Sequence, residues 1–357
     1  MTFRLMITGG AGFVGSSLAA AFRRDHPQWN VVAFDNLKRR GSELCVERLR
    51  AFGVDFHHGD VRSAEDLEAV GPVDLLIECS AEPSAHAGYG ESPHYLVATN
   101  LGGTVNCLEY LRRHGGDLLF LSTSRVYPIG ALRDLPFERR GDRFDLSAPA
   151  RGDGWTAEAG ISEAFPLAGS RSLYGATKLA SELLIEEYRC MYGLRAVVNR
   201  CGVLAGPWQM GKVDQGFVVL WMARHVYGGS LAYMGFGGTG LQVRDVLHVD
   251  DLYDLLVHQL RDLDRHSGAI YNVSGGRSSS VSLCELTECC RRLTGQRLKI
   301  GRSEKTRPAD IPYYVGDSRA VAAATGWRPR RALSDILQQI HQWLLENRTQ
   351  LEPILGG

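Results

Sequence analysis

The stretch that decides the fold is Ile7-Thr8-Gly9-Gly10-Ala11-Gly12-Phe13-Val14-Gly15-Ser16, close to the start of the chain. An apolar run over residues 3–7 predicts a buried strand before it, and a helical pattern follows it. Gly9 permits a tight turn, Gly12 lets a phosphate approach bare backbone, and Gly15 lets the helix pack closely. The first N–H groups of such a helix attract an anion. The pattern therefore predicts a turn that holds the pyrophosphate of a dinucleotide.

An acidic residue closes the next predicted strand. Residues 30–34 predict that strand, and Asp35 follows it, twenty positions beyond Gly15. A carboxylate at this place accepts hydrogen bonds from the ribose hydroxyls of adenosine and repels the extra phosphate of the phosphorylated cofactor, so NAD is favoured. The basic run Lys38-Arg39-Arg40 leaves the alternative open, because a nearby cation accommodates that phosphate.

Strands and helices alternate through the first half of the chain. Helices are predicted over residues 42–52, 63–70 and 93–114, and strands over residues 55–58, 74–79 and 117–122. This alternation predicts an α/β fold with a Rossmann-type doubly wound parallel sheet, whose ligands bind beyond the carboxyl ends of the strands. The residues that follow the predicted strands, and that we expect on this rim, are Asp35, Asn36, Asp60, Val61, Ser80, Ala81 and Ser122–Ser124. For Asp60, which could meet the adenine amino group with Val61 behind the ring, a plain surface turn is an equal alternative.

The second half predicts a different organisation. Residues 127–173 are irregular and rich in proline and glycine, which is typical of a functional cover or a disordered excursion. A helix over 175–191 and a strand over 195–200 follow. We expect a dinucleotide-binding domain over residues 1–206 with an insertion at 128–172. A smaller, mixed α+β region over residues 207–357 is expected to bind the second ligand, and residues 241–265 to return to the first domain.

Composition excludes several classes of function. The chain of 357 residues has 40 basic and 40 acidic residues, so no global field recruits nucleic acid or a membrane surface. Its eight cysteines are scattered without a CxxC motif, which indicates reduced thiols in a cytoplasmic protein and no metal site. No signal peptide is expected, and no apolar stretch approaches the ~20 residues needed to span a bilayer.

Tyr174 and Lys178 form a Y-x3-K pair at the start of a predicted helix. A spacing of four places both side chains on one helix face. The ammonium would then lower the pKa of the phenol, and a nearby nicotinamide cation would lower it further. Such a phenol is a suitable base for a sugar or alcohol hydroxyl. An incidental tyrosine and lysine at an exposed helix start is the alternative, which the neighbouring glycine turn disfavours.

Two further groups of residues are candidates for substrate contacts. Ser122-Thr123-Ser124 offers three hydroxyls at the rim, one of which could hydrogen-bond the reacting hydroxyl, although strand-end hydroxyls also cap backbone groups. Arg244 and Arg307 carry the planar guanidinium that suits phosphate oxygens. Whether they converge on one diphosphate or form ion pairs with Asp245 and Asp310 is left open by the sequence.

Taken together, the motifs resemble those of the extended short-chain dehydrogenase/reductase family, in its nucleotide-sugar epimerase and dehydratase branch. The resemblance spans almost the whole chain, from Ile7 to about Arg331. Its motifs are ITGGAGFVGS at 7–16, FDNL at 34–37, GDVR at 59–62, NLGGT at 100–104, STSRVY at 122–127, YGATK at 174–178, QVRDVLHVDD at 242–251 and TRPADI at 306–311.

The resemblance implies a role for each matched position. Thr123, Tyr174 and Lys178 fall at the catalytic hydroxyl, the base and its partner, and Thr123, Arg244 and Arg307 fall at substrate contacts. NAD contacts are implied for Gly9, Gly12, Phe13, Val14, Asp35, Asn36, Asp60, Val61, Ser80, Ala81, Asn100, Tyr174 and Lys178. A homo-oligomer, dimer or tetramer, is usual in relatives.

The resemblance also narrows the reaction. Family dehydratases carry acids directly after the threonine, whereas this chain has Ser124 and Arg125, so we expect no 4,6-dehydratase activity. Finer features, such as the long insertion and residues 213–217, are similar to enzymes that epimerise C2 of a CDP-linked 3,6-dideoxyhexose, the CDP-tyvelose (CDP-paratose) 2-epimerases. A UDP-sugar 4-epimerase is the close rival. A non-catalytic NAD(P)-binding sensor is disfavoured because both Tyr174 and Lys178 are present.

Overall fold

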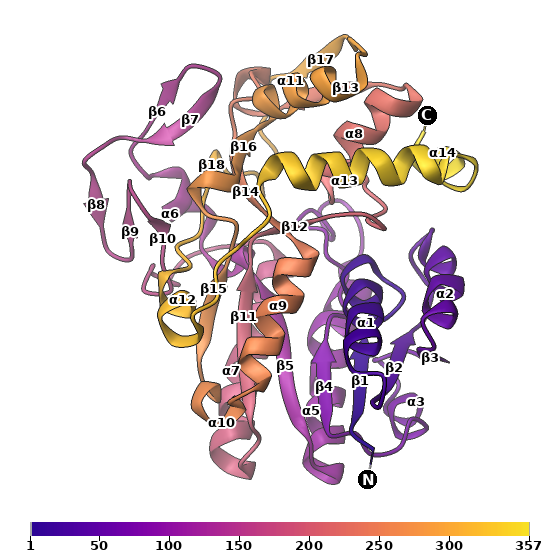
Figure 1. Ribbon diagram of the computed structural model, residues 1–357. Coiled ribbons are helices and arrows are strands. Elements are labelled where there is room, and N and C mark those ends of the chain that lie inside the picture. The colour runs from indigo at the N-terminus through magenta and orange to yellow at the C-terminus, as the bar shows by residue number, and fades with distance from the viewer. Residues whose placement is uncertain (1, 357) are drawn as a thin grey trace.

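The computed structural model describes residues 2–356 and is built around a seven-stranded parallel sheet (Figure 1). The strand order is β15-β11-β5-β4-β1-β2-β3. The strands are β1 (Arg4–Thr8), β2 (Asn30–Asp35), β3 (Asp55–His58), β4 (Leu75–Glu78), β5 (Asp117–Thr123), β11 (Ala196–Cys201) and β15 (Ile270–Val273). The predicted doubly wound sheet is therefore confirmed, with β1 between β2 and β4, where the strand order reverses.

Helices cover both faces of this sheet, as its apolar strands require. Leu5 and Ile7 of β1 face one layer, in the same hydrophobic cluster as residues of α1 (Phe13–Asp25) and α9 (Val249–Leu260). Met6 faces the other layer and clusters with α5 (Gly103–His114) and α7 (Leu173–Tyr192). Shorter helices at the edges are α2 (Ser42–Ala51), α3 (Ala64–Glu68) and α10 (Leu263–His266). Alternate residues of one strand thus serve two cores.

The predicted helix over 93–114 is continuous but not uniform. It consists of α4 (His94–Val97), a π-helical turn η1 (Ala98–Gly102) and α5. The π turn carries Asn100, which is fully buried and bonded to the backbone of Glu82 on the loop after β4. A π turn widens the helix by one residue and often lies beside a functional site.

A second, mixed α+β region lies above the carboxyl ends of the main strands (Figure 1). Its four-stranded sheet joins β12 (Val203–Ala205), β14 (Val243–His248), β16 (Ser280–Ser282) and β18 (Tyr313–Tyr314), and a two-stranded sheet joins β13 (Leu231–Met234) to β17 (Ile300–Ser303). Its helices are α8 (Phe217–Tyr227), α11 (Leu283–Thr294), α13 (Leu333–Glu346) and α14 (Arg348–Leu355), with the 3₁₀ turns η3 (Phe236–Gly238) and η4 (Arg277–Ser279), whereas α12 (Arg319–Thr325) packs on β15 and α9 of the main domain. Within residues 241–265, α9 packs on the main domain, whereas β14 belongs to the smaller sheet.

The stretch 128–172 is folded rather than irregular. It contains α6 (Ile129–Arg133), the hairpin β6 (Phe137–Arg140) and β7 (Arg143–Leu146), and a small sheet of β8 (Arg151–Gly152), β9 (Trp155–Thr156) and β10 (Gly160–Ile161). Its apolar residues pack with Tyr313 and Tyr314 of β18 in one cluster. It therefore extends the second region, beyond the edge of the main sheet.

No helix within residues 2–356 is both long and apolar enough to cross a membrane. No group of three or more His, Cys, Asp or Glu side chains within that range is arranged to hold a metal ion.

Candidate functional site

A cavity of about 790 Å³ opens at the carboxyl ends of the main strands, where parallel sheets bind ligands. Its walls come from both regions of the molecule. Most of the sequence-predicted site residues line it: Gly9, Gly12, Phe13, Val14, Asp35, Asn36, Val61, Ser80, Ala81, Thr123, Tyr174, Lys178, Arg244 and Arg307. Asp60 and Asn100 are absent from this lining.

The glycine turn is packed so tightly that side chains are excluded. Gly9 has φ +64°, and a Cβ there would lie 2.9 Å from the backbone of Cys79. A Cβ on Gly15 would lie 2.2 Å from the Gly9 carbonyl oxygen, which explains the close start of α1. At Gly12, the residue before α1, a Cβ would have only the Gly9 oxygen near it, at 3.1 Å. The N-terminus of α1 thus presents bare backbone to the cavity.

Asp35 supports this turn from the end of β2. Its Oδ2 accepts a hydrogen bond from the Ala11 N–H at 3.1 Å, and its Oδ1 accepts one from Leu37 N–H at 2.7 Å. Burial raises the pKa of this carboxyl, because the charged form is less well solvated there. Nearby, the hydroxyl of Ser80 is buried without a hydrogen-bond partner among residues 2–356. An exposed helix end, a carboxylate with spare lone pairs and an orphaned hydroxyl together fit a dinucleotide.

Asp60 and Asn100, two predicted cofactor contacts, are hydrogen-bonded to neighbouring protein groups. The carboxylate of Asp60 accepts from Arg62 and Asn36, and its hydrogen bonds with Arg62 lower its pKa to about 2. Asn100 lies behind the wall, where it anchors the backbone of Glu82. Both side chains therefore support the rim of the cavity, and their contacts with the cofactor stay predictions.

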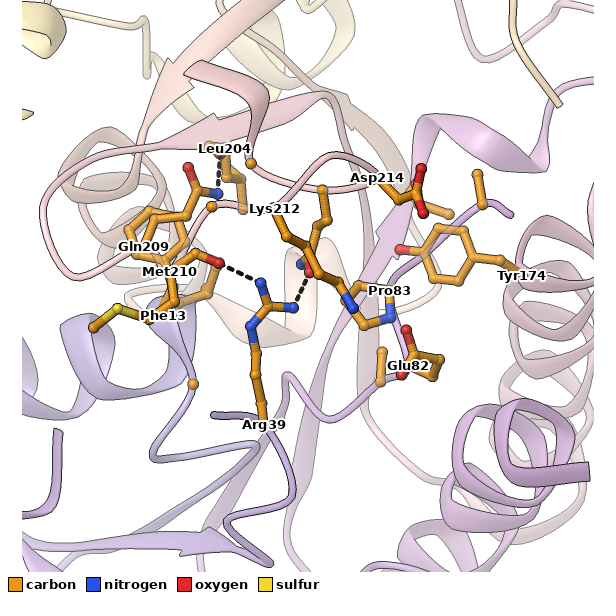
Figure 2. Close-up of a pocket in the computed structure, with 18 of the residues that line it drawn as sticks. Phe13, Arg39, Glu82, Pro83, Tyr174, Leu204, Gln209, Met210, Lys212 and Asp214 are labelled. Atoms are coloured by element: carbon orange, nitrogen blue, oxygen red, sulfur yellow. Dashed lines mark hydrogen bonds between the residues drawn. The ribbon is translucent and has the colours of Figure 1, made fainter. Parts of the chain in front are cut away.

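The basic run after β2 also has protein partners. Arg39 donates to the Met210 carbonyl and to Gln215, and Figure 2 shows its guanidinium reaching across the cavity mouth. The segment 209–216, here called the strap, is thereby tied to the dinucleotide side of the cavity. Lys38 lies 4.5 Å from the centre of the Tyr95 ring. These contacts engage Lys38 and Arg39, two of the basic residues that could otherwise accommodate the extra phosphate of the phosphorylated cofactor.

Thr123 and Tyr174 come together at the inner end of the cavity. Thr123 ends β5, and Tyr174 begins α7, which is capped by the Ser172 hydroxyl. The phenol oxygen of Tyr174 points into the cavity (Figure 2). Burial raises the pKa of this phenol, and its hydrogen bond with Thr123 opposes that rise. Both side chains line the same cavity, as a base and its assisting hydroxyl require.

Lys178, the predicted partner of Tyr174, lines the same cavity. Its side chain is buried, with Nζ 3.9 Å from the centre of the Phe120 ring. Burial lowers the pKa of Lys178, and the buried carboxyl of Glu78 is the group that most opposes this. The cation that most lowers the pKa of Tyr174 is Arg125, not Lys178. That the ammonium makes the phenol acidic when NAD is bound stays a prediction.

The two predicted substrate arginines differ in their partners. Arg244 does not pair with Asp245; it donates to the carbonyls of Val243 and Ile311, both at 2.7 Å. Burial, together with the like charge of Arg125, lowers the pKa of Arg244 to about 9. Arg307 does pair with Asp310, at 3.2 Å, and also with Asp214 of the strap.

Segment 307–311 is held by arginines from other elements, which bond every one of its carbonyls. Arg133 donates to the carbonyls of residues 307, 308 and 310, at 3.1, 3.0 and 2.7 Å. Arg125 donates to the carbonyl of Ala309 at 2.9 Å, and Arg244 donates to the carbonyl of Ile311. The carboxylate of Asp310 meets His86 Nε2 at 3.0 Å. Although burial opposes it, hydrogen bonds from His86 and Arg307 lower the pKa of Asp310. The segment is a rigid support for the guanidinium groups of the cavity.

Comparison with known proteins agrees with this arrangement. The model of the NAD dependent epimerase/dehydratase family matches residues 5–274, which is most of the chain. The chain belongs to that family. NAD is the cofactor of the family, and the glycine turn and Asp35 are the features of this member that fit it.

Relatives within the family have several activities. CDP-paratose 2-epimerase of Salmonella typhi is 27% identical over 95% of this chain and 98% of its own. UDP-glucuronate 4-epimerase 2 of Arabidopsis thaliana is 24% identical over 96% of this chain and 75% of its own. A dTDP-glucose 4,6-dehydratase of Streptomyces venezuelae, solved with NAD bound, is 25% identical with a TM-score of 0.78, over 99% of this chain and 100% of its own.

Three residues of the site were missed by sequence reasoning. Glu78 is buried at the end of an otherwise apolar strand, where Thr104 donates to its Oε1 at 2.5 Å and its Oε2 has no partner among the described residues. The signal that could have identified Glu78 was a charged residue directly after the three apolar residues of β4. Arg125 and Asp214 stand in motifs that the sequence analysis named, but their contacts were not predicted, because their partners are distant in the sequence.

Proposed function

We propose that this protein is an NAD-dependent epimerase of a nucleotide-activated sugar. The observation that carries the proposal is one cavity that holds a glycine turn at one end and the Thr123–Tyr174 pair at the other. Arg244 and Arg307 line the same cavity, where their charge suits the diphosphate of a sugar nucleotide.

The chain's own residues supply binding and proton transfer. When bound, NAD accepts a hydride from a ring carbon of the sugar and returns it. Tyr174 Oη takes the proton of the hydroxyl on that carbon and later gives it back. The side-chain hydroxyl of Thr123 hydrogen-bonds the same sugar hydroxyl. Lys178 lies one helical turn beyond Tyr174, the base. Return of the hydride to the opposite face requires the sugar to turn while the arginines keep its diphosphate.

The residues after Thr123 favour epimerisation over elimination of water. Dehydration needs an additional acid and base beside the sugar, whereas Ser124 and Arg125 stand there. We therefore expect no 4-keto-6-deoxy product from any nucleotide hexose.

The substrate we favour is a CDP-linked 3,6-dideoxyhexose, epimerised at C2. Similarity to CDP-paratose 2-epimerase over nearly the whole of both chains supports it. A UDP-sugar epimerised at C4 is the alternative, and similarity to UDP-glucuronate 4-epimerase supports that.

A panel of CDP-, UDP- and GDP-sugars, assayed for epimer formation by nuclear magnetic resonance, tests the proposal. We expect turnover of one CDP-sugar without added NAD. Mass spectrometry of the ligands that copurify with the protein provides an independent identification of cofactor and substrate. Absence of turnover with the whole panel, in protein that retains NAD, would contradict an epimerase.

The remaining proposals concern organisation. We propose a dinucleotide-binding domain over residues 1–206, with the insertion at 128–172 and with residues 241–265 returning to it, and a sugar-nucleotide-binding region formed mainly by residues 207–357. We also propose a homo-oligomer, dimer or tetramer. Leu183 and Met191 on the outer face of α7 are 65% and 66% exposed, which supports burial against a second copy. Light scattering of Leu183→Asp against the unchanged chain tests whether the protein is an oligomer.

All eight cysteines are unpaired, which supports a cytoplasmic location.

A further inference from the structure

His86 lies on the loop between β4 and α4, and it lines the cavity. In the sheet, β4 stands between β1, which leads into the glycine turn, and β5, which ends in Thr123. The loop therefore leaves the sheet between the dinucleotide end of the cavity and the Thr123–Tyr174 pair. Under the proposed function, the sugar meets the nicotinamide at this part of the rim.

A series of hydrogen bonds fixes the backbone of this loop. The buried amide of Asn100 accepts from the Glu82 N–H at 2.7 Å and donates to the Glu82 carbonyl at 3.1 Å. The Ser84 N–H then donates to Glu82 Oε1 at 3.3 Å, and the His86 N–H donates to Ser84 Oγ at 3.2 Å. Such local bonds from side chain to backbone hold a loop that has no helix or strand of its own. The π turn that carries Asn100 thus determines where His86 stands.

The imidazole of His86 is oriented by Asp310. Its Nε2 lies 3.0 Å from Asp310 Oδ1, and only 13% and 14% of the two side chains are exposed. Arg307 holds the same carboxylate, with its Nε and Nη2 each 3.2 Å from an oxygen, and Arg133 donates to the Asp310 carbonyl. Burial by itself would raise the pKa of Asp310, but the hydrogen bonds from His86 and Arg307 lower it, so Asp310 is a carboxylate at ordinary pH.

This carboxylate decides which nitrogen of His86 is free. A carboxylate only accepts hydrogen bonds, so the proton of the neutral imidazole lies on Nε2 and the lone pair lies on Nδ1. Nothing among residues 2–356 forms a hydrogen bond with Nδ1, and this atom is not sealed from water. A lone pair suits a hydroxyl group, which can donate, and does not suit a phosphate oxygen. His86 therefore presents an oriented acceptor for a hydroxyl to the cavity.

The neighbours of His86 indicate which ligand group it faces. Asp310 joins it to Arg307, the proposed ligand of the diphosphate. One residue earlier, the Ala309 carbonyl accepts from Arg125, which follows Thr123 by two positions. Segment 307–311 thus runs from the diphosphate side of the cavity to the side of the Thr123–Tyr174 pair. In a nucleotide sugar, the sugar is the group that connects these two places.

We propose that His86 Nδ1 accepts a hydrogen bond from a sugar hydroxyl other than the one that Tyr174 deprotonates, and that Asp310 is the residue that orients it. This inference rests on the proposed function. A 3,6-dideoxyhexose that is linked at C1 and oxidised at C2 has one other ring hydroxyl, at C4. For the favoured substrate, His86 therefore selects the hydroxyl at C4.

The test compares each sugar nucleotide with its own nucleoside diphosphate. NAD-loaded protein carrying Tyr174→Phe, which we expect not to turn over, is titrated in a calorimeter with CDP-paratose and CDP, and with UDP-glucose and UDP. Within each pair, the ratio of the two dissociation constants isolates the sugar. His86→Gln keeps a donor for Asp310, because the glutamine amide nitrogen reaches the place of Nε2, but it has no acceptor in the place of Nδ1. We expect about three- to tenfold weaker binding of the sugar nucleotide, the loss of one hydrogen bond, and a change within about twofold for the nucleoside diphosphate.

Three further variants sharpen the comparison. Arg307→Met should weaken both members of a pair by the same factor, so its ratio should not change. His94→Gln, at an exposed histidine of α4 outside the cavity lining, should weaken neither member. His86→Asn places an amide oxygen close to the position of Nδ1 and should recover part of the lost sugar binding.

The outcomes separate this inference from the proposed function. An unchanged ratio in folded His86→Gln would overturn the inference, as would an equal loss of affinity for the nucleoside diphosphate. If His86→Gln does not fold, His86→Ala takes its place with the same expected ratio. Failure of both sugar nucleotides to bind the NAD-loaded protein with His86 intact would instead overturn the proposed function, and the inference with it.

Discussion

The two ends of the cavity are built by different means. At the dinucleotide end, the geometry is made by backbone: three glycines, the first turn of α1 and one carboxylate twenty residues further on. At the substrate end it is made by long side chains, with Arg125, Arg133 and Arg244 holding segment 307–311 and Asp214 holding Arg307. The first end tolerates few substitutions, whereas the second can be retuned one side chain at a time.

The largest effect is expected at the residue between these ends. Tyr174→Phe should lower kcat by about 10²–10⁴-fold, the usual contribution of a positioned acid or base. NAD should remain bound, because the glycine turn is untouched, and its amount can be measured after release from the denatured protein. Tyr188→Phe, on the same helix but outside the cavity lining, is the matched control and should keep full turnover.

Gly15→Ala tests the backbone-built end. Its Cβ would lie 2.2 Å from the Gly9 carbonyl oxygen, so the turn must shift, and we expect a loss of about 1–3 kcal/mol together with weakened NAD binding. Thermal unfolding and NAD content measure both. Gly102→Ala adds a Cβ that meets nothing within 4 Å and should leave both unchanged. An unshifted melting temperature in Gly15→Ala would mean that the close contact is not required.

Arg307→Met tests the end built from side chains. Removing a charged donor from a diphosphate should raise KM for the sugar nucleotide by about tenfold or more, with little change in kcat. Initial rates over a range of substrate concentrations separate the two parameters. Arg302→Met, an exposed arginine on the neighbouring strand β17, should change neither. A fall in kcat without a rise in KM would place Arg307 away from the diphosphate.

The smallest effect is expected from Asp214→Asn, and it should have the opposite sign. Asp214 occupies the Arg307 guanidinium, and both side chains are partly exposed, at 38% and 31%. Exposed ion pairs contribute at most about 1 kcal/mol, so releasing Arg307 for the diphosphate should lower KM by up to about fivefold. Asp153→Asn, an exposed aspartate of the insertion, is the control for the change of charge. A raised KM would show that Asp214 assists binding instead of competing with it.

Prediction from sequence succeeded where neighbours along the chain decide the structure. Gly9, Gly15 and Asp35 act through contacts with backbone close in sequence or on an adjacent strand, so their pattern implies their geometry. It did not predict the protein partners of Asp60 and Asn100, which are Arg62 and the Glu82 backbone, because these residue types suit a ligand and a protein group equally well. The insertion at 128–172 looked irregular because its strands are only two to four residues long, too short for a periodic signal.

The local pattern alone therefore established the parallel sheet, the dinucleotide turn and the family of this chain, since strand alternation and glycine spacing depend on short-range geometry. Which side chains meet around the substrate end of the cavity could emerge only from the folded chain. Arg125 donates to the carbonyl of Ala309, 184 positions further along the chain, and Arg307 pairs with Asp214, 93 positions before it. Charge in a buried site depends on every group within a few ångströms, and those groups come from remote parts of the chain.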